Sequence, residues 1–138
     1  RTDWGHSALD LIDFMKSGQF SDGLDLLNEI ALIGLNCGAE SKRVEDTGML
    51  YAIKGISQLV RAMQMRNVTE KRMMVYPNAG PPLLDNNKRT YYSHTPEEMA
   101  AKIPDLLDVG AYLLGGCCGT GPEHIKSYRD AVDLYYKT

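Results

Sequence analysis

The chain has 138 residues, of which 43% are apolar and 24% are charged, and its formal net charge at pH 7 is -3. This length and composition suit a single domain with a packed core. The mixed charges argue against a nucleic-acid or anionic-membrane surface, and no apolar run approaches the roughly 20 residues that a membrane-spanning helix needs.

The first 29 residues are predicted to form a helical lead-in. Apolar residues spaced through 9–15 predict a helix that ends near Gly18, and residues 19–28 can continue helically after it. The chain starts at Arg1 without a methionine or a signal-peptide pattern. We therefore expect an internal start within a longer protein.

Three strand-helix units are predicted over residues 30–138. Short apolar runs, of the kind that form strands buried on both faces, occur at 30–35, 73–76 and 111–114. Helices are predicted at 49–65, from Thr95 to about Val109, and from Thr120 to about Tyr136; polar loops are predicted at 39–47 and 83–94. This alternation predicts an α/β fold with parallel strands and helical crossovers.

Two of the predicted helices carry distinct start signals. Thr95, Pro96 and Glu98 form a capping-box pattern with proline in the first turn, and Pro104 then predicts a kink or a break. Gly121 stands where the last helix is expected to be capped, a position that glycine tolerates at small cost.

The three cysteines follow predicted strands. Cys37 comes after the first strand, and Cys117 and Cys118 come after the third. The carboxyl ends of parallel strands share one edge of a sheet, so three sulfurs that are far apart in sequence can meet there. Flanking glycines, at 115, 116 and 119, are expected to free the backbone from strand geometry and turn both neighbouring sulfurs inward.

Three thiolates suit zinc and leave its fourth position open, as in a catalytic site. An ion there would favour the deprotonated form of a bound substrate thiol. Two other readings remain open at this point: the cysteines can be small buried hydrophobes, or Cys117 and Cys118 can form a vicinal disulfide. Three is an odd number for a disulfide framework, and so few cysteines indicate a reducing cytoplasm.

Three sequence blocks together resemble the homocysteine S-methyltransferase family. They are residues 34–37 (Gly-Leu-Asn-Cys), residues 76–80 (Tyr-Pro-Asn-Ala-Gly), and residues 115–120 (Gly-Gly-Cys-Cys-Gly-Thr) together with 122–125 (Pro-Glu-His-Ile). The resemblance implies a (β/α)8 barrel, of which these strand-helix units would be the C-terminal part, too short to close a barrel alone. It also implies zinc held by Cys37, Cys117 and Cys118, and methyl transfer to the thiol of homocysteine, giving methionine.

The methyl donor and the substrate contacts are less defined. The segment after Asn78 resembles the homocysteine-binding module of cobalamin-dependent methionine synthase, which implies methylcobalamin and a corrinoid protein or module; betaine and S-methylmethionine serve other relatives. Asn36, Asn78 and Gly116 are candidate substrate-binding residues, although both asparagines also suit plain turns. We expect His94 to be solvated and His124 to pack or hydrogen-bond in the last helix.

The sequence is also compatible with two other functions. The chain can methylate a different small thiol. It can also be a zinc-binding barrel fragment without activity of its own, which would need the N-terminal barrel half or self-association with a second chain, since an exposed strand edge favours association.

Overall fold

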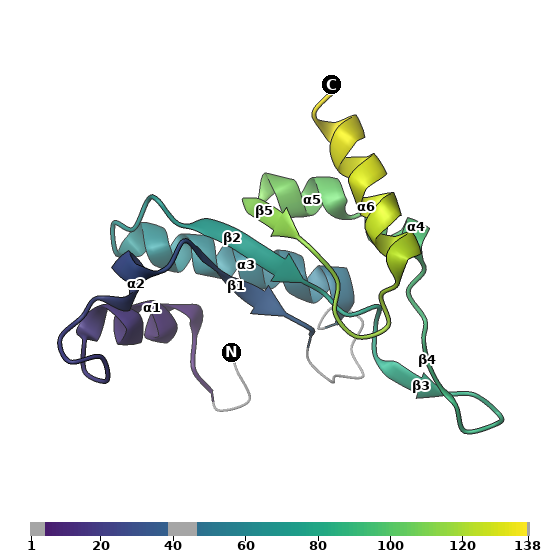
Figure 1. The fold of residues 1–138 in the computed structure, drawn as a ribbon, viewed down its shortest axis with the longest axis horizontal. Coiled ribbons are helices and arrows are strands. Elements are labelled where there is room, and N and C mark those ends of the chain that lie inside the picture. Colours follow the sequence, from purple (N-terminus) through teal and green to yellow (C-terminus); the bar gives the residue numbers. More distant parts are fainter. Residues whose placement is uncertain (1–4, 39–46, 138) are drawn as a thin grey trace.

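The structure is a computed structural model that describes residues 5–38 and 47–137 (Figure 1). Its elements, in chain order, are α1 (Ala8–Ser17), α2 (Leu26–Glu29), β1 (Leu32–Asn36), α3 (Gly48–Met65), β2 (Arg72–Tyr76), β3 (Pro82–Leu84), β4 (Thr90–Tyr92), α4 (Pro96–Ala100), α5 (Ile103–Asp108), β5 (Ala111–Leu114) and α6 (Pro122–Tyr135). Most of the loop predicted at 39–47 lies outside the described residues.

Three strands form a parallel sheet in the order β1-β2-β5. Ile33 lies opposite Met73, and Val75 lies opposite Leu114. The connections run through α3 and through α4 and α5, which confirms the predicted α/β fold with parallel strands and helical crossovers. Among the described strands, β1 and β5 each pair only with β2, so each has one unpaired edge and the sheet does not close into a barrel.

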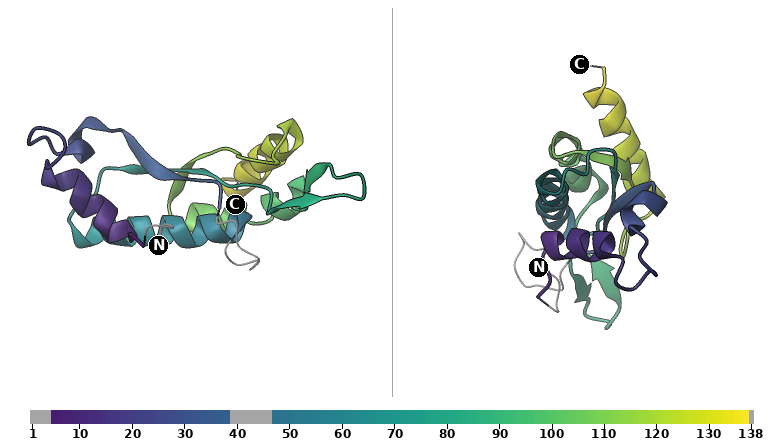
Figure 2. Two further views of the ribbon diagram at one scale, coloured as in Figure 1. Left: turned by 90° about the horizontal axis from the view of Figure 1, so that it is seen from below. Right: turned by 90° about the vertical axis from the view of Figure 1, so that its left-hand side faces the viewer.

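The helices α1, α3 and α5 lie together on one side of the sheet (Figure 2). Alternate residues of β2 point into this core, where Met73 and Val75 are fully buried, together with Ile56 of α3 and Leu106 of α5. The other face of the sheet is more open, and Tyr112 is 59% exposed there with Arg72 stacked over its ring. The apolar runs therefore form strands with one face packed and one face partly open among the described residues.

The lead-in helix α1 packs against α3. The guanidinium of Arg66, at the end of α3, donates to both carboxylate oxygens of Asp13, and this hydrogen bond lowers the pKa of Asp13. Gly18 ends α1 in the left-handed conformation, at φ 66°, and accepts from the amides of Ser21 and Gly23. The predicted helical continuation over 19–28 is wrong for most of its length because this turn intervenes; only α2 is helical.

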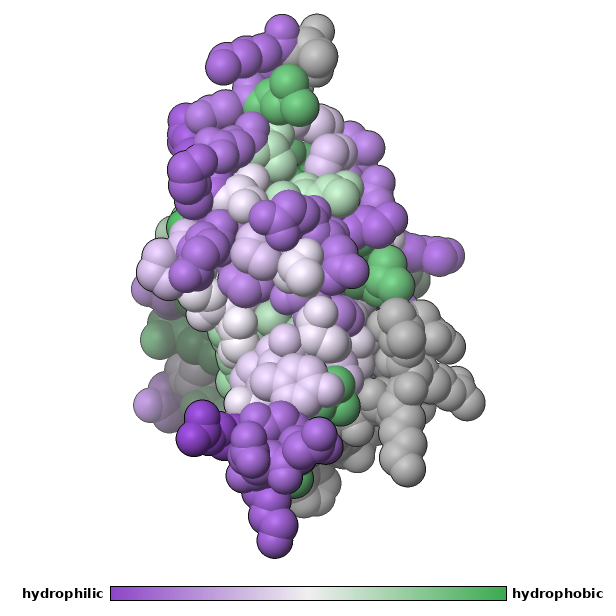
Figure 3. Space-filling model, turned by 90° about the vertical axis from the view of Figure 1, so that its right-hand side faces the viewer, coloured by the Kyte–Doolittle hydropathy of each residue, from purple (hydrophilic) through white to green (hydrophobic). Residues whose placement is uncertain are grey.

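The predicted polar loop at 83–94 is also wrong in part, because it contains an antiparallel hairpin of β3 and β4. The carboxylate of Asp85 accepts from the amides of Asn87 and Arg89, and Lys88 adopts φ 59°, so a local turn closes the hairpin. The hairpin projects at the end of the molecule toward which the parallel strands run (Figure 1). Viewed from that end, the surface is mainly hydrophilic (Figure 3).

The break predicted at Pro104 is confirmed. Two short helices, α4 and α5, replace one long helix, and Pro104 lies in the first turn of α5. The capping box is present as predicted: Thr95 Oγ1 accepts from the amide of Glu98, and Glu98 Oε2 accepts from the amide of Thr95. Within the described part of the chain, no helix is both long and apolar enough to cross a membrane.

Candidate metal centre

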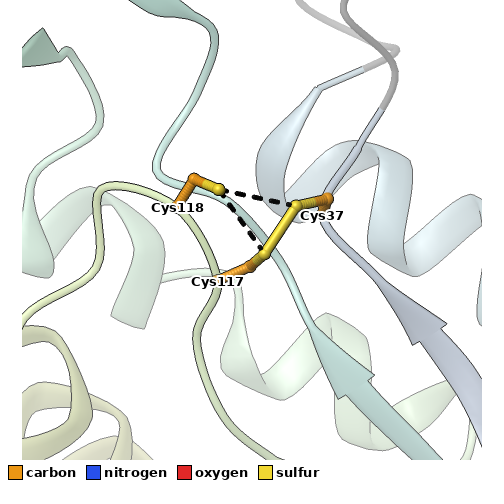
Figure 4. A group of neighbouring side chains, drawn as sticks. All are labelled: Cys37, Cys117 and Cys118. Atoms are coloured by element: carbon orange, nitrogen blue, oxygen red, sulfur yellow. Dashed lines mark hydrogen bonds between the residues drawn. A yellow bond between two sulfur atoms is a disulfide. The ribbon is translucent and has the colours of Figure 1, made fainter. Parts of the chain in front are cut away.

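Cys37, Cys117 and Cys118 converge at one end of the sheet (Figure 4). Cys37 directly follows β1, and the other two lie in the loop between β5 and α6. All three sulfur atoms lie within 4.8 Å of one another. The sequence prediction that strand ends would bring these residues together is therefore confirmed in space.

The sulfur atoms form one bonded pair and two longer contacts. Cys37 and Cys117 are joined as a disulfide, and Cys118 Sγ lies 3.8 Å from each of the other two sulfurs. The vicinal disulfide between Cys117 and Cys118 is not formed, and none of the three cysteines is a fully buried hydrophobe. Reduction of the Cys37–Cys117 bond would leave three thiols facing one point.

These distances can be compared with a zinc site. Four ligands at about 2.3 Å from a tetrahedral zinc ion lie about 3.8 Å from one another. The two contacts of Cys118 Sγ, at 3.8 Å each, match that spacing. The donor set and two of its three sulfur separations thus fit zinc.

The segment after β2 anchors both cysteine-bearing segments through the backbone. The Cys37 amide donates to the Tyr76 carbonyl at 2.7 Å, and the Cys117 amide donates to the Pro77 carbonyl at 2.9 Å. The Ala79 amide donates to the Cys118 carbonyl at 2.9 Å. The end of the middle strand therefore fixes the spacing of the two outer segments.

The loop that carries Cys117 and Cys118 depends on small residues, although not always for the expected reason. Gly119 has φ 79° and lies against the Tyr92 ring, so it needs the left-handed conformation that glycine permits. Gly115 and Gly116 do not have positive φ. They are required by close approach, because a Cβ atom would overlap the ring of Tyr76 or the side chain of Thr120 respectively.

Cys37 reaches the cluster through an unusual backbone conformation. Its φ is 58°, in the left-handed region that side chains other than glycine seldom adopt. This conformation interrupts the strand geometry of β1 immediately after Asn36. The sequence did not predict this conformation, because cysteine has no preference for positive φ.

The three candidate substrate-binding residues lie at different depths around the cluster. Asn36 is exposed, and its amide nitrogen lies 3.9 Å from Cys117 Sγ, to which it donates. Asn78 is 6% exposed, and its Oδ1 accepts from the amide of Gly48 at 2.9 Å. Gly116 is half-buried beside Thr120, whose hydroxyl donates to the Cys117 carbonyl at 2.6 Å.

Two histidines, His94 and His124, lie next to each other, with His124 Nε2 at 3.1 Å from the His94 carbonyl oxygen. The expectation that His94 is solvated holds only in part: it is partly exposed, and its ring lies against Gly48 and Gly80, both of which have positive φ. With Met49 of α3 it lines a pocket of about 510 Å³ that none of the cysteines borders. His124 is 9% exposed and hydrogen-bonds within the first turn of α6, as expected.

Comparison with known proteins gives consistent matches over most of the chain. Residues 10–132 match a family model described as homocysteine S-methyltransferase. A methionine synthase of Mycobacterium leprae is 32% identical over 109 residues, which cover 73% of this chain and 9% of the relative. A methionine synthase of Mycobacterium tuberculosis is 33% identical over 104 residues, which cover 75% of this chain and 8% of the relative. A protein named homocysteine S-methyltransferase 1, from Saccharomyces cerevisiae, is 25% identical over 115 residues, which cover 82% of this chain and 31% of the relative.

The chain corresponds to only a small part of each of these relatives. It spans less than a tenth of the two methionine synthases and about a third of the yeast protein. The matched region nevertheless includes β1, β2 and β5, and with them all three cysteines of the cluster.

Proposed function

The chain belongs to the homocysteine S-methyltransferase family, and on that premise we propose that it takes part in zinc-dependent methyl transfer to the thiol of homocysteine. The observation that carries this proposal is the convergence of three sulfur atoms, from the ends of two strands, within 4.8 Å. Cys37, Cys117 and Cys118 are the proposed metal ligands.

Zinc, when bound by three thiolates, leaves one position open and favours the deprotonated form of a thiol held there. The residues of this chain act around that position. Asn36 donates to Cys117 Sγ and so offsets part of the negative charge that three thiolates bring together. The backbone amides of Cys37, Cys117 and Ala79 hold the ligand loops to the end of β2.

The proposed chemistry is a substitution at the methyl carbon. The thiol of homocysteine gives up its proton to solvent, and its sulfur attacks the methyl group. A carbon–sulfur bond forms while the bond between the methyl carbon and the donor breaks, and the donor leaves with the electron pair. None of the three cysteines is methylated in turnover, and the product is methionine.

We assign the amino-acid portion of homocysteine to residues around the cluster, from the exposed Asn36 to Asn78, which is 6% exposed. Asn36 and Gly116 lie next to Cys117 and are accessible from that side. Asn78 is the third proposed contact. Its Oδ1 atom already accepts from Gly48, so its Nδ2 hydrogens are the group assigned to the substrate.

The three strand-helix units of residues 30–138 are proposed to be the C-terminal units of a (β/α)8 barrel, with residues 1–29 as a lead-in. The unpaired edges of β1 and β5 and the open sheet face around Tyr112 support this assignment, because further strands would pair and cover them. The N-terminal barrel half, or a second copy of the chain, is the proposed partner.

Methylcobalamin on a corrinoid module is the proposed methyl donor, since two of the relatives are methionine synthases and the segment after Asn78 resembles that group. A reducing compartment, such as the cytoplasm, is proposed as the site of action. The proposed metal site needs Cys37 and Cys117 as free thiolates, and oxidation would keep them joined as a disulfide.

The test is the zinc content of the reduced chain, with Cys117→Ala as the matched variant. The expected result is one zinc per wild-type chain and none in the variant; less than half an equivalent in the wild type would overturn the metal site. Methylation of homocysteine and of two other small thiols is then measured with each methyl donor. Zinc binding without turnover would favour the fragment alternative, and turnover would then be restored by adding the upstream polypeptide.

A further inference from the structure

We propose that His124 is a positioning residue for Cys118, and that its Nε2–H group is the part that acts. This inference rests on the proposed zinc site. The Nδ1 atom of His124 accepts from the amide of Gly121 at 3.1 Å, and its Nε2 atom lies 3.1 Å from the carbonyl oxygen of His94. A carbonyl oxygen only accepts and a backbone amide only donates, so both contacts are made by the neutral Nε2–H tautomer.

The contact with His94 continues to the metal centre. The amide of His94 donates to the Ala79 carbonyl at 3.0 Å, and the amide of Ala79 donates to the Cys118 carbonyl at 2.9 Å. Three successive hydrogen bonds therefore link His124 to Cys118. The covalent chain from Cys118 through Gly119 and Gly121 to His124 closes the ring.

The ring holds the backbone of Cys118 itself, whereas the neighbouring hydrogen bonds to Pro77 and Thr120 hold Cys117. Cys118 is exposed, so its side chain is not fixed by packing, and Gly119 beside it has φ 79°. In contrast, Ala79 is fully buried and His124 is 9% exposed. The hydrogen bond between His124 and the His94 carbonyl is partly buried, so the carbonyl would lose a stabilising contact if its donor were removed. Removing the His124 donor should therefore loosen the backbone that holds Cys118.

A simpler role for His124 is capping of α6. His124 is the third residue of the helix, and an acceptor at that position satisfies the amide of the capping residue. Capping uses only Nδ1, whereas the proposed role uses Nε2–H. Glutamate and glutamine both supply the capping acceptor and have the same shape, but only glutamine can also donate to the His94 carbonyl.

The experiment compares His124→Glu with His124→Gln in the full, reduced, zinc-loaded chain. The readout is the rate at which zinc passes to an excess chelator, and thermal unfolding is followed in parallel. We expect His124→Glu to release zinc about 10-fold faster than the wild type, and His124→Gln to stay within about threefold. Equal release rates for the two variants, whether fast or slow, would overturn the proposal, since the donor group would then have no part.

A measurement on the wild type keeps the proposal testable if His124→Glu does not fold. The Nε2–H proton of His124 should exchange slowly with solvent in the metal-free, reduced chain because it is donated to the His94 carbonyl, whereas capping through Nδ1 alone leaves it free to exchange; rapid exchange, or a proton on Nδ1 instead, would overturn the proposal. The proposed function is tested separately, because a wild-type chain that holds no zinc would refute the metal site without any reference to His124.

Discussion

The side-chain amide nitrogen of Asn36 lies 3.9 Å from the sulfur of Cys117, across the end of the middle strand of the sheet. Asn36 is the last residue of β1, whereas Cys117 follows β5. An N–H group directed at sulfur favours the thiolate, the form that binds metal. The contact thus joins a residue proposed for substrate binding to a proposed metal ligand.

Replacing Asn36 by aspartate should weaken zinc binding. The substitution keeps the shape but exchanges an N–H donor for a negative oxygen that faces a thiolate, so we expect a loss of about 10- to 100-fold in affinity by chelator competition. Asn87→Asp, on the exposed tip of the hairpin, is the control because it makes the same charge change away from the cluster. Equal affinities for the two variants would contradict a role for Asn36.

Substitution of Gly119 by alanine should destabilise the fold more than a positive φ alone explains. Gly23→Ala is the matched variant: Gly23 has φ 85°, but nothing lies within 4 Å of an added Cβ, so strain of about 1 kcal/mol is its expected cost. At Gly119 the Cβ would also overlap the Tyr92 ring, which we expect to add about 1–3 kcal/mol. Urea unfolding measures both, and equal losses would show that Tyr92 moves aside freely.

The sequence predicted those parts of the fold that depend on local patterns. Buried-type apolar runs marked all three strands of the parallel sheet, and the Thr95–Glu98 pair marked the start of α4. The meeting of Cys37 with Cys117 followed from one further rule, that parallel strands end at the same edge.

What the sequence missed depends on contacts between distant segments. The ring of hydrogen bonds through Ala79 and His94 involves backbone groups, which any residue type supplies and no pattern marks. His94 lies in a polar stretch, and it is partly buried because Gly48 and Gly80 leave room for its ring. The hairpin, in contrast, could have been predicted from local sequence. Asp85 lies between Leu83–Leu84 and Tyr91–Tyr92, and an aspartate between two such pairs indicates a turn.

Tyr128 should give the chain an alkaline transition. Burial between α6 and α4, where its hydroxyl lies 3.5 Å from the sulfur of Met99, raises the pKa of Tyr128 from 10.0 to about 12. The folded state therefore favours the protonated phenol, and this contribution is complete below pH 10 and is lost as the pH rises toward 12. We expect the free energy of unfolding to fall by about 1–3 kcal/mol more in the wild type than in Tyr128→Phe over this interval.

The check is urea unfolding at several pH values between 9 and 12, since about two pH units separate the two ionisations. Tyr128→Phe retains the ring and its packing but has no ionisable group, so other tyrosines and lysines affect both proteins equally. Parallel pH profiles for the two proteins would show that Tyr128 ionises in the folded state as it does in the unfolded chain.

Asn78 tests whether one residue serves both the fold and the substrate. Its Oδ1 accepts from the Gly48 amide, at the start of α3, and it is 6% exposed. Asn78→Ala leaves that buried amide without an acceptor and should lower the free energy of unfolding by about 1–3 kcal/mol. Asn78→Asp keeps an acceptor oxygen but loses both hydrogens of the amide. It also buries a carboxylate, whose cost the start of α3 offsets in part, so its loss in urea unfolding should be smaller than that of Asn78→Ala.

The aspartate variant then isolates the proposed substrate contact. Homocysteine binding to the zinc-loaded chain is measured by calorimetry, and we expect Asn78→Asp to bind about 10-fold more weakly, equivalent to about 1.4 kcal/mol. Zinc content is measured in the same samples, because a loss of metal would weaken homocysteine binding by another route. Unchanged affinity at full zinc occupancy would show that Asn78 only accepts from Gly48 and does not bind the substrate. Of the three proposed residues, Asn36 and Gly116 would then remain as contacts for the amino-acid portion of homocysteine.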